Sequence, residues 1–363
     1  MPGSIPHDCS QAVQGQIVSF LSSVPDGSTI QFQTDGCYEV NETITLPYLS
    51  NITVNGEGST FEDTVWPTNN SIWEAEGGSN ITFENMTIDG SNPYAGCLAG
   101  DSSGPCATQG CYTASYEWQY GVDFEGTQGG TVNNVAINNV GGDFVETEDL
   151  NDNVNSAPTT NITIENSIFT NNGRMGVGIT DANGVTIENN IFTGVCWEMV
   201  DMESDVSVEF SKNVAILNNT LGSNDFGILS DGGNAVAANE GPVTVTGNTM
   251  NTCPATTESP IQLDSIVGQV TTGFTINNNY LVSNGALAGI GIYNESNGVV
   301  DGNSVDMCTY QGGSPYVVLL NTDNNLTIEN NNGDIGIHQG SWAGGVYIDS
   351  LSTNVITSGN DPP

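Results

Sequence analysis

The sequence predicts an all-β solenoid, a parallel β-helix, from a repeated phrase, its strand-like alternation and the absence of helical pattern between its copies. Residues 161–171 read Asn-Ile-Thr-Ile-Glu-Asn-Ser-Ile-Phe-Thr-Asn, and residues 184–194 read Gly-Val-Thr-Ile-Glu-Asn-Asn-Ile-Phe-Thr-Gly. The copies begin 23 residues apart (184 minus 161). A repeat period of roughly 20 to 50 residues is typical of solenoids, whose repeats bury a face only by stacking on their neighbours.

The same phrase returns along most of the chain. Its alternation of apolar and polar residues predicts short half-buried strands, and its recurring Asn predicts a turn where a left-handed backbone is tolerated and amides stack from rung to rung. From Thr131 on, strands and turns alone must build the coil. The rungs begin at Asn80, Thr131, Asn161, Val185, Val214, Val243, Phe274, Val299 and Leu326.

The N-terminal segment carries the one helical pattern. Residues 9–21 place Val13, Ile17, Val18 and Leu21 on one helical face, with Ser10 as the expected N-cap. A short helix here would cover the open end of the stack, as a solenoid needs to avoid end-to-end association. Residues 1–60 are therefore predicted to form the cap and the first rungs.

The length of 363 residues fits one continuous solenoid domain, 1–363. Residues 91–118, which contain three cysteines, interrupt the rungs and predict a disulfide-tied loop insertion that walls a binding cleft. No run of 18 apolar residues and no signal-peptide pattern occurs, so we expect no membrane insertion and, for a secreted protein, a mature chain.

The charge balance excludes several partners. The formal net charge is -40, because 42 acidic residues face only two cations, Arg174 and Lys212. Such a surface repels nucleic acid, anionic lipid and polyanions, so the expected partners are neutral, cationic or bridged by metal ions. Adaptation to high salt or low pH explains the same composition without any partner.

The eight cysteines favour an oxidising compartment. They form no Cys-x-x-Cys motif, which argues against structural zinc, and we expect disulfides between Cys9 and Cys37 and within Cys97, Cys106 and Cys111. An extracellular or cell-surface glycoprotein is also consistent with the Asn-x-Ser/Thr sequons. These lie at Asn41, Asn51, Asn69, Asn80, Asn85, Asn161, Asn218, Asn294 and Asn325.

The helical cap, the Pro-Asp-Gly-Ser-Thr-Ile opening at 25–30 and the Asn-rich rungs resemble the right-handed parallel β-helix proteins of the pectin-lyase-like superfamily. The resemblance covers nearly the whole chain. It predicts the fold and not the activity, since that superfamily holds lyases, glycoside hydrolases, epimerases, tailspikes and adhesins.

A second strand in each rung carries acidic residues. If Val122, Val145, Val177, Val200, Ile228, Ile261, Ile290 and Val346 point inward, the alternate residues form two outward columns. The first column reads Asp123, Glu146, Gly178, Asp201, Leu229, Gln262, Gly291 and Tyr347, and the second reads Glu125, Glu148, Thr180, Glu203, Asp231, Asp264, Tyr293 and Asp349.

The rung of Gly178 carries no outward carboxylate, whereas the rungs on either side carry two each. This predicts a slot for a sugar ring, flanked by Glu146 and Glu148 on one side and by Asp201 and Glu203 on the other. Two rung steps separate the flanks by about 9–10 Å, compatible with the carboxyl separation of about 6.5–9.5 Å in inverting glycosidases. We expect Glu203 or Asp201, near Trp197 and Met199, as general acid, and Glu146 or Glu148 as base.

Arg174 precedes the small rung and is expected to hold one carboxylate ionised or to bind a hydroxyl, with a turn-stabilising salt bridge as the alternative. Asp123, Trp197, Asp231, Asp264 and Tyr293 complete the predicted substrate-binding set, although aromatic residues are commonly core. A solvated face, or a Ca²⁺ site that clamps rungs together, is the alternative for the acidic columns, since carboxylates are suitable calcium ligands.

Two functions remain for the fold and the residues. Lyases of the superfamily commonly use Lys or Arg on uronates, and polygalacturonases add a His and a basic motif near the acidic cluster; this chain lacks both patterns. The first interpretation is a secreted glycoside hydrolase that acts on a neutral polysaccharide and requires no cofactor. The second is a non-catalytic surface, fibre or adhesion scaffold, in which acidity serves solubility, self-assembly or calcium binding.

Overall fold

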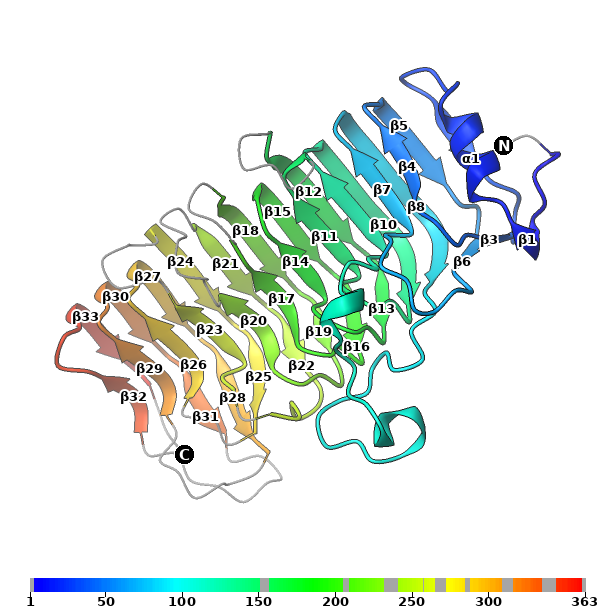
Figure 1. The fold of residues 1–363 in the computed structure, drawn as a ribbon. Coiled ribbons are helices and arrows are strands. Elements are labelled where there is room, and N and C mark those ends of the chain that lie inside the picture. The colour runs from blue at the N-terminus through cyan, green and yellow to red at the C-terminus, as the bar shows by residue number, and fades with distance from the viewer. Residues whose placement is uncertain are drawn as a thin grey trace.

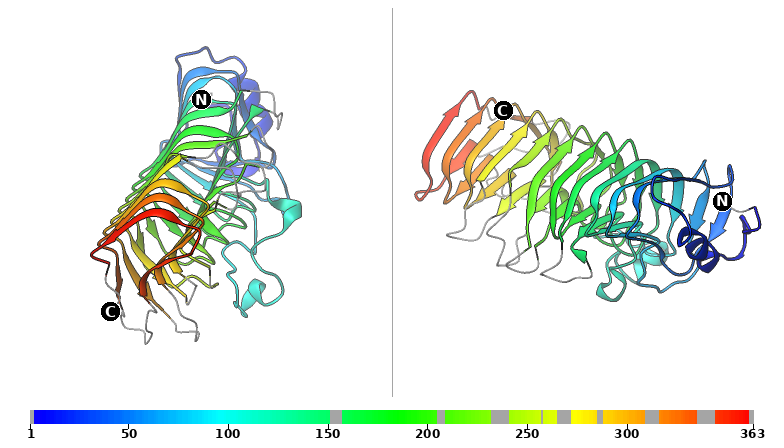
Figure 2. Two further views of the ribbon diagram at one scale, coloured as in Figure 1. Left: turned by 90° about the vertical axis from the view of Figure 1, so that its left-hand side faces the viewer. Right: turned by 90° about the horizontal axis from the view of Figure 1, so that it is seen from above.

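The protein is a right-handed parallel β-helix, as the sequence predicts (Figure 1). The computed structural model describes residues 3–150, 157–204, 209–231, 241–256, 258–264, 272–284, 288–308, 316–334 and 344–360. The rungs stack in sequence order from the N-terminal to the C-terminal end, and neighbouring rungs pair in parallel (Figure 2).

Two sheets make up the described part of the coil. The smaller sheet has eleven strands, one from each rung, and its outer face carries the acidic columns. Its strands, in spatial order, are β4 (Ile44–Pro47), β7 (Trp73–Glu76), β9 (Val122–Glu125), β11 (Val145–Glu148), β14 (Val177–Ile179), β17 (Glu198–Met202), β20 (Gly227–Asp231), β23 (Ile261–Asp264), β26 (Ala288–Tyr293), β29 (Tyr316–Asn321) and β32 (Gly344–Ile348).

The larger sheet bends around the rest of each rung and contains the repeated phrase. Its described strands are β1 (Asp8–Ala12), β2 (Thr29–Gln31), β3 (Cys37–Glu39), β5 (Ser50–Asn55), β6 (Thr60–Glu62), β8 (Ser79–Asp89), β10 (Gln128–Asn138), β12 (Thr159–Glu165), β13 (Ile168–Thr170), β15 (Ala182–Glu188), β16 (Ile191–Thr193), β18 (Ser211–Leu217), β19 (Thr220–Leu221), β21 (Val243–Thr246), β22 (Thr249–Met250), β24 (Thr272–Asn277), β25 (Tyr280–Ser283), β27 (Ser296–Asp301), β28 (Ser304–Met307), β30 (Asn324–Glu329), β31 (Asn332–Asp334) and β33 (Thr353–Ser358).

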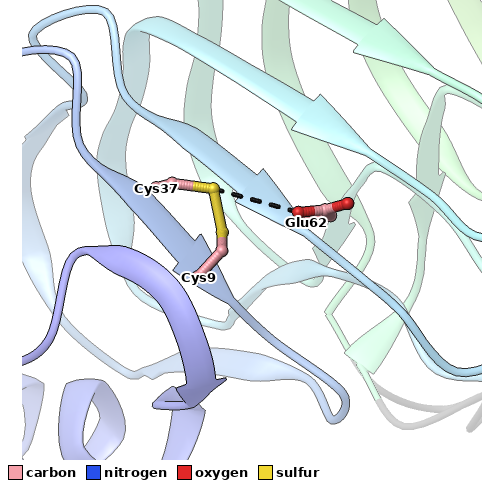
Figure 3. Close-up of side chains that lie close together, drawn as sticks. All are labelled: Cys9, Cys37 and Glu62. Atoms are coloured by element: carbon pink, nitrogen blue, oxygen red, sulfur yellow. Dashed lines mark hydrogen bonds between the residues drawn. A yellow bond between two sulfur atoms is a disulfide. The ribbon is translucent and has the colours of Figure 1, made fainter.

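The N-terminal helix is shorter than predicted. Helix α1 spans Gln14–Leu21 and buries Ile17 and Leu21 against the first rungs, but the expected N-cap Ser10 is wrong. Residues 8–12 instead form β1, which pairs with β3, because the predicted Cys9–Cys37 disulfide joins these two strands. Glu62 Oε2 lies 3.9 Å from Cys37 Sγ (Figure 3), but the sulfurs of Cys9 and Cys37 are joined in the disulfide and offer no thiolate to a metal.

The core is filled by inward residues of both sheets. Phe144, Phe169 and Phe192 pack against one another in a row, with the centroids of neighbouring rings 5.3 Å and 4.6 Å apart. The predicted inward valines on β9, β11, β14 and β17 are all fully buried. Their burial fixes which residues of the smaller sheet face outward, since successive side chains of a strand point to opposite faces.

The predicted stacking of Asn amides is present from Asn190 onward, at the turn between the two strands that a rung contributes to the larger sheet, such as β15 and β16. The first residue of the turn adopts positive φ, as Asn189 and Asn218 do, and the second joins a buried ladder. In that ladder Asn190 Nδ2 donates to Asn219 Oδ1 at 3.1 Å and to a backbone carbonyl at 2.8 Å. The ladder continues through Asn248, Asn279, Asn303 and Asn331 to Asn360.

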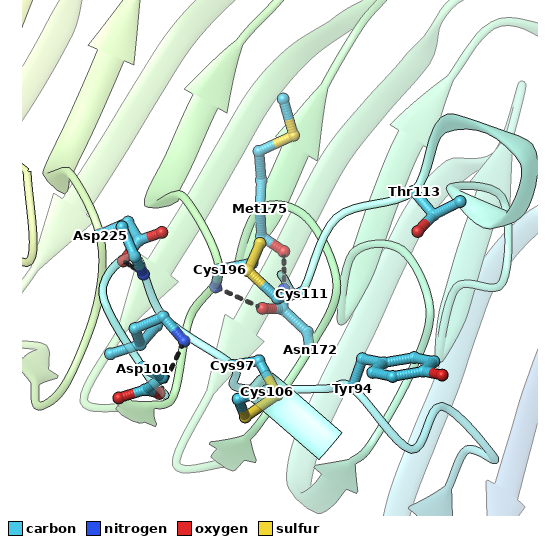
Figure 4. The surroundings of a disulfide bond; sticks show 12 residues. Tyr94, Cys97, Asp101, Cys106, Cys111, Thr113, Asn172, Met175, Cys196 and Asp225 are labelled. Atoms are coloured by element: carbon cyan, nitrogen blue, oxygen red, sulfur yellow. Dashed lines mark hydrogen bonds between the residues drawn. A yellow bond between two sulfur atoms is a disulfide. The ribbon is translucent and has the colours of Figure 1, made fainter. Parts of the chain in front are cut away.

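The loop insertion at 91–118 contains two short 3₁₀ helices, η1 (Gly104–Ala107) and η2 (Ala114–Tyr116). The expected disulfide within the loop joins Cys97 to Cys106. Cys111 reaches across to Cys196 and ties the loop to the turn before β17 (Figure 4). A fourth disulfide joins Cys253 to Cys308, and such extensive disulfide use favours an oxidising compartment. None of the described helices is long and apolar enough to span a bilayer.

Candidate active site

The predicted outward columns are correct from β9 to β17. Asp123 pairs in register with Glu146, Glu146 with Gly178, and Gly178 with Asp201. Glu125 pairs with Glu148 in the second column. One rung of the acidic face was missed: on β7, Glu74 and Glu76 pair with Asp123 and Glu125 and extend both columns. The alternation Trp-Glu-Ala-Glu at 73–76 is the signal that identifies this rung.

Beyond β17 the predicted register is wrong by one residue. Val200 pairs with Leu229 and not with Ile228, so Ser230 follows Asp201 in the first column. Leu229 is buried, and the backbone of Asp231 aligns with Leu263 rather than with Asp264. The cause is that Ile228 and Leu229 are both apolar, so alternation alone does not say which one continues the inward row.

The predicted column positions are correct again from β23 on, but Asp264 and Tyr293 lie away from the acidic rungs. Asp264 pairs with Tyr293 as predicted, two and three rungs past Asp201. Burial raises the pKa of Asp264. The prediction also omitted the rung of β29, which lies between β26 and β32. Asp264 and Tyr293 are therefore not brought together with the central carboxylates.

Arg174 lies at the centre of the acidic cluster. Its Nη1 donates to Asp143 Oδ2 at 3.1 Å, and its Nη2 donates to Glu203 Oε2. Both alternatives left open for Arg174 meet in this arrangement, because the ion pairs also hold the turn in which it lies. A carboxylate bound by a guanidinium is a charge-assisted pair, which favours the ionised form of the acid.

The turn that presents Arg174 is fixed from both sides. Asn172 Nδ2 donates to the carbonyl of Met175, and the backbone N–H of Cys196 donates to Asn172 Oδ1 at 2.9 Å (Figure 4). The N–H of Met175 in turn donates to Asp143 Oδ1 at 2.7 Å. One buried amide thus locks the arginine turn to the disulfide at Cys196.

The small rung is occupied by carboxyl groups of the chain itself. A Cβ at Gly178 would lie only 2.7 Å from Asp143 Oδ2 and would also collide with Glu146 Oε2. Thr180 Oγ1 donates to Glu146 Oε1 at 2.9 Å. The predicted slot is therefore not an open sugar site, because the side chain of Glu146 folds over Gly178.

Asp143 and Glu146 form what we call the central acid pair. Glu146 Oε2 is buried, and a hydrogen bond between the carboxyls of Glu146 and Asp143 requires a proton on one of the two. Burial raises the pKa of Glu146 well above its ordinary value, and the neighbouring charges of Asp143 and Glu148 add to this. A proton shared between the two carboxyls satisfies both, as expected for like charges in contact.

Two further acids on β17 have perturbed pKa values. Burial raises the pKa of Asp201 well above its ordinary range, and the charges of Glu198 and Glu203 raise it further. Burial also raises the pKa of Glu198 to about 8, with Asp143 and Glu203 contributing. Glu203 remains partly exposed, with 25% of its side chain accessible. Neighbouring carboxyls thus lie in unequal environments, the condition for acid and base roles at one site.

A cavity of about 250 Å³ opens beside these acids. Glu198 lines it together with Trp197, Phe226 and Leu229. The loop insertion supports this wall, because the Tyr112 ring packs on Trp197 with centroids 4.4 Å apart. Trp197 packs edge-on against Phe226 in turn. The cavity offers apolar and aromatic surface next to a buried acid.

A second cavity of about 240 Å³ lies on the N-terminal side of the same face. Its lining includes Glu74, Asp123, Glu125, Glu148 and the exposed Trp118. Burial raises the pKa of Glu74 to about 7, and Glu125 and Glu76 add to the shift. The acidic face is thus divided into a half centred on Arg174 and a half without a cationic side chain among the described residues.

Sequence reasoning missed Asp143, Glu198 and Tyr112. Asp143 and Glu198 lie before the alternating part of their strands, where position does not tell whether a side chain faces out. Tyr112 lies in the loop insertion, and its contact with Trp197 follows from the disulfide between Cys111 and Cys196. Cys111, the third cysteine of the loop, is left over after Cys97 pairs with Cys106, and it is the one sequence signal for the contact between Tyr112 and Trp197.

A sequence profile of the right-handed β-helix region matches residues 41–196 and 152–361. A search of curated proteins finds no match. Among solved structures, the catalytic unit of a GH87 α-1,3-glucanase from Streptomyces thermodiastaticus is 13% identical with a TM-score of 0.61, over 99% of this chain and 69% of that one.

Two other solved structures are similar over nearly the full length of both chains. Polygalacturonase from Erwinia carotovora is 14% identical with a TM-score of 0.63, covering 98% of each chain. The surface protein and adhesin PfbA of Streptococcus pneumoniae is 14% identical with a TM-score of 0.53, also covering 98% of each. At this identity the likeness concerns the fold alone. From the profile match and the coil, the chain belongs to the family of right-handed parallel β-helix proteins.

Proposed function

We propose that the protein is a glycoside hydrolase that acts on a neutral polysaccharide. The observation that carries the proposal is Glu198: it lines a cavity with aromatic walls, and its pKa of about 8 keeps it protonated at neutral pH. A general acid must reach the leaving group and hold a proton at the working pH. Glu198 meets both conditions.

Glu203 supplies the ionised partner in this proposal. It was expected as a candidate acid, but its ion pair with Arg174 favours a carboxylate, and its partial exposure gives it access to water. Glu146 was expected as a candidate base, but it lies buried in the central acid pair. The proposed roles are therefore Glu198 as acid and Glu203 as base, with burial and the charges of Asp143 and Glu203 keeping the proton on Glu198.

Charge supports a neutral substrate. With Arg174 held by two carboxylates and a net charge of -40, the face has no free guanidinium to bind a uronate. The α-1,3-glucanase with the same fold is named for a neutral glucan. We also propose that the protein is secreted, because its disulfides require an oxidising compartment to form.

The test is turnover on a panel of neutral and acidic polysaccharides. Hydrolysis should fall about 10²–10⁴-fold in Glu198→Gln, the range for loss of a general acid. Asp264→Asn, on the same face but two rungs past Asp201, serves as the control and should keep its activity. The alkaline limb of the pH profile near 8 should disappear in Glu198→Gln variants that retain residual activity.

The second candidate is a non-catalytic surface scaffold, which the similar fold of the pneumococcal adhesin and the burial of the central acid pair favour. Release of new reducing ends from a glycan would exclude it. Binding to a glycan or surface without any turnover, unchanged in Glu198→Gln, would instead refute the hydrolase proposal.

A further inference from the structure

The N-terminal half of the acidic face gathers three carboxylates from two neighbouring strands. Asp123 and Glu125 lie on β9, and Glu148 lies on β11 directly beside Glu125. One carboxylate oxygen from each lies within 4.8 Å of the other two. We call these three residues the N-terminal carboxylate cluster.

Asp123 is the residue that makes this cluster more than a solvated patch. It is only 3% exposed, and its Oδ2 accepts a hydrogen bond from Ser71 Oγ at 3.2 Å. Its Oδ1 is buried and has no hydrogen-bond partner among the described residues. A buried carboxyl oxygen without a hydrogen-bond partner destabilises the folded state, so we expect Asp123 Oδ1 to bind a ligand that accepts its lone pairs.

No cationic side chain of the protein is available as that ligand. The sequence has only Arg174 and Lys212. Arg174 is paired with Asp143 and Glu203, and Lys212 Nζ lies 4.7 Å from the centre of the Phe210 ring. Carboxylates this close recruit a cation or take up protons.

We propose that Asp123, Glu125 and Glu148 bind a divalent cation with the preferences of Ca²⁺. Ca²⁺ takes oxygen ligands at about 2.3–2.6 Å, so oxygens on opposite sides of the ion lie up to about 4.6–5.2 Å apart. The three carboxylate oxygens lie within 4.8 Å of one another, which is compatible with that limit. Mg²⁺ usually keeps several waters and is bound by only one or two carboxylates, so a cluster of three carboxylates favours Ca²⁺.

The surroundings suit a hard cation. The adjoining cavity is lined by the oxygen-bearing side chains of Asn69, Asn70 and Ser71, and it has room for water ligands. No Cys or His lines it, so the donor set does not favour zinc. The ion would join β9 to β11 beside the proposed hydrolytic site, but its binding does not depend on the hydrolase activity.

The experiment titrates chelator-treated protein at pH 8, where protons compete least. Ca²⁺ is added in a calorimeter, and Tb³⁺ is added with excitation of the tryptophans, because Trp118 lines the same cavity. We expect saturable binding with a Kd of about 10⁻⁴–10⁻³ M or tighter, the range of extracellular calcium modules. Ca²⁺ should displace Tb³⁺ and raise the melting temperature.

Glu125→Gln and Glu148→Gln each remove one ligand from a partly exposed position and should weaken binding at least tenfold. Asp264→Asn removes one charge from the same face outside the cluster and should leave the affinity unchanged. Absence of saturable binding at pH 8 would overturn the proposal and assign neutralisation of the cluster to protons. Equal weakening by Asp264→Asn and Glu125→Gln would also overturn it, since that result indicates diffuse attraction only.

Discussion

Replacing Arg174 by Met tests whether one buried cation stabilises the acidic cluster. Asp143, with no solvent exposure, would lose the guanidinium that lies 3.1 Å away. The stranded carboxylate would then take up a proton. Burial raises the pKa of Asp143 even with Arg174 in place, so 3.8 is the pKa of the unfolded chain, and relative to it the proton costs at most about 4 kcal/mol at pH 7 and about 2 kcal/mol at pH 5. The first value agrees with the about 3–5 kcal/mol lost when one partner of a buried ion pair is removed.

The loss of unfolding free energy converts directly into a decrease in melting temperature. An unfolding entropy of about 2.1 cal/mol/K per residue gives about 0.76 kcal/mol/K for 363 residues. Arg174→Met should therefore melt up to about 5–6 °C below the wild type at pH 7 and up to about 2 °C below it at pH 5. Thermal unfolding followed by circular dichroism at both pH values measures the difference.

Lys212→Met is the matched control, because it removes the other positive charge of the chain and leaves the cluster intact. The double variant Arg174→Met, Asp143→Asn should recover part of the lost stability, since it removes the stranded charge. If Arg174→Met costs no more than Lys212→Met at pH 7, or if its cost does not shrink at pH 5, the guanidinium does not hold the cluster and the reasoning fails.

The folding stability of the wild type should fall as the pH rises from 5 to 8. The pKa values of Glu198 and Asp323 are raised to about 8 and about 7, so the folded state keeps protons that the unfolded chain releases near its ordinary pKa values. Melting temperatures that stay flat or rise from pH 5 to pH 8 would contradict this prediction. Gly178→Ala should cost about 1–3 kcal/mol by overpacking, because its Cβ would lie 2.7 Å from Asp143 Oδ2, and an unchanged melting temperature would refute the contact. Asn219→Ala should lower the free energy of unfolding in urea by about 2–4 kcal/mol, because it leaves buried groups of the Asn ladder unpaired. A loss below about 1 kcal/mol, the size of one ordinary hydrogen bond, would mean that water replaces the amide.

The sequence predicted those features that depend on period and alternation. Val122, Val145, Val177 and Val200 are inward as expected, because each is followed by a polar or small residue that can face outward, so burial leaves one register. The prediction failed at Ile228, where two consecutive apolar residues offer two registers of similar burial. The information that decides between them lies in the neighbouring strands, which alternation within one strand does not report.

The candidate site could be predicted only in part, because its chemistry depends on contacts between segments distant in sequence. The carboxylates of Glu146, Asp201 and Glu203 were located from the columns. Their charge states were not, since these follow from Asp143 at a strand entrance and from which acids Arg174 reaches. The position of a residue in a column predicts which carboxylates lie close together. Whether each carboxyl is protonated depends on its burial and on its distance from the Arg174 guanidinium.

Gly178 shows why the rung without carboxylates is nevertheless central. Its missing side chain leaves the space in which Asp143 and Glu146 meet, and Arg174 from the preceding turn then binds Asp143 on one side and Glu203 on the other. A larger residue would separate the acids and remove the reason to bury a cation there. The chain has only two cationic residues, and one of them binds beside Gly178. The charge pattern of the whole acidic face therefore depends on this glycine.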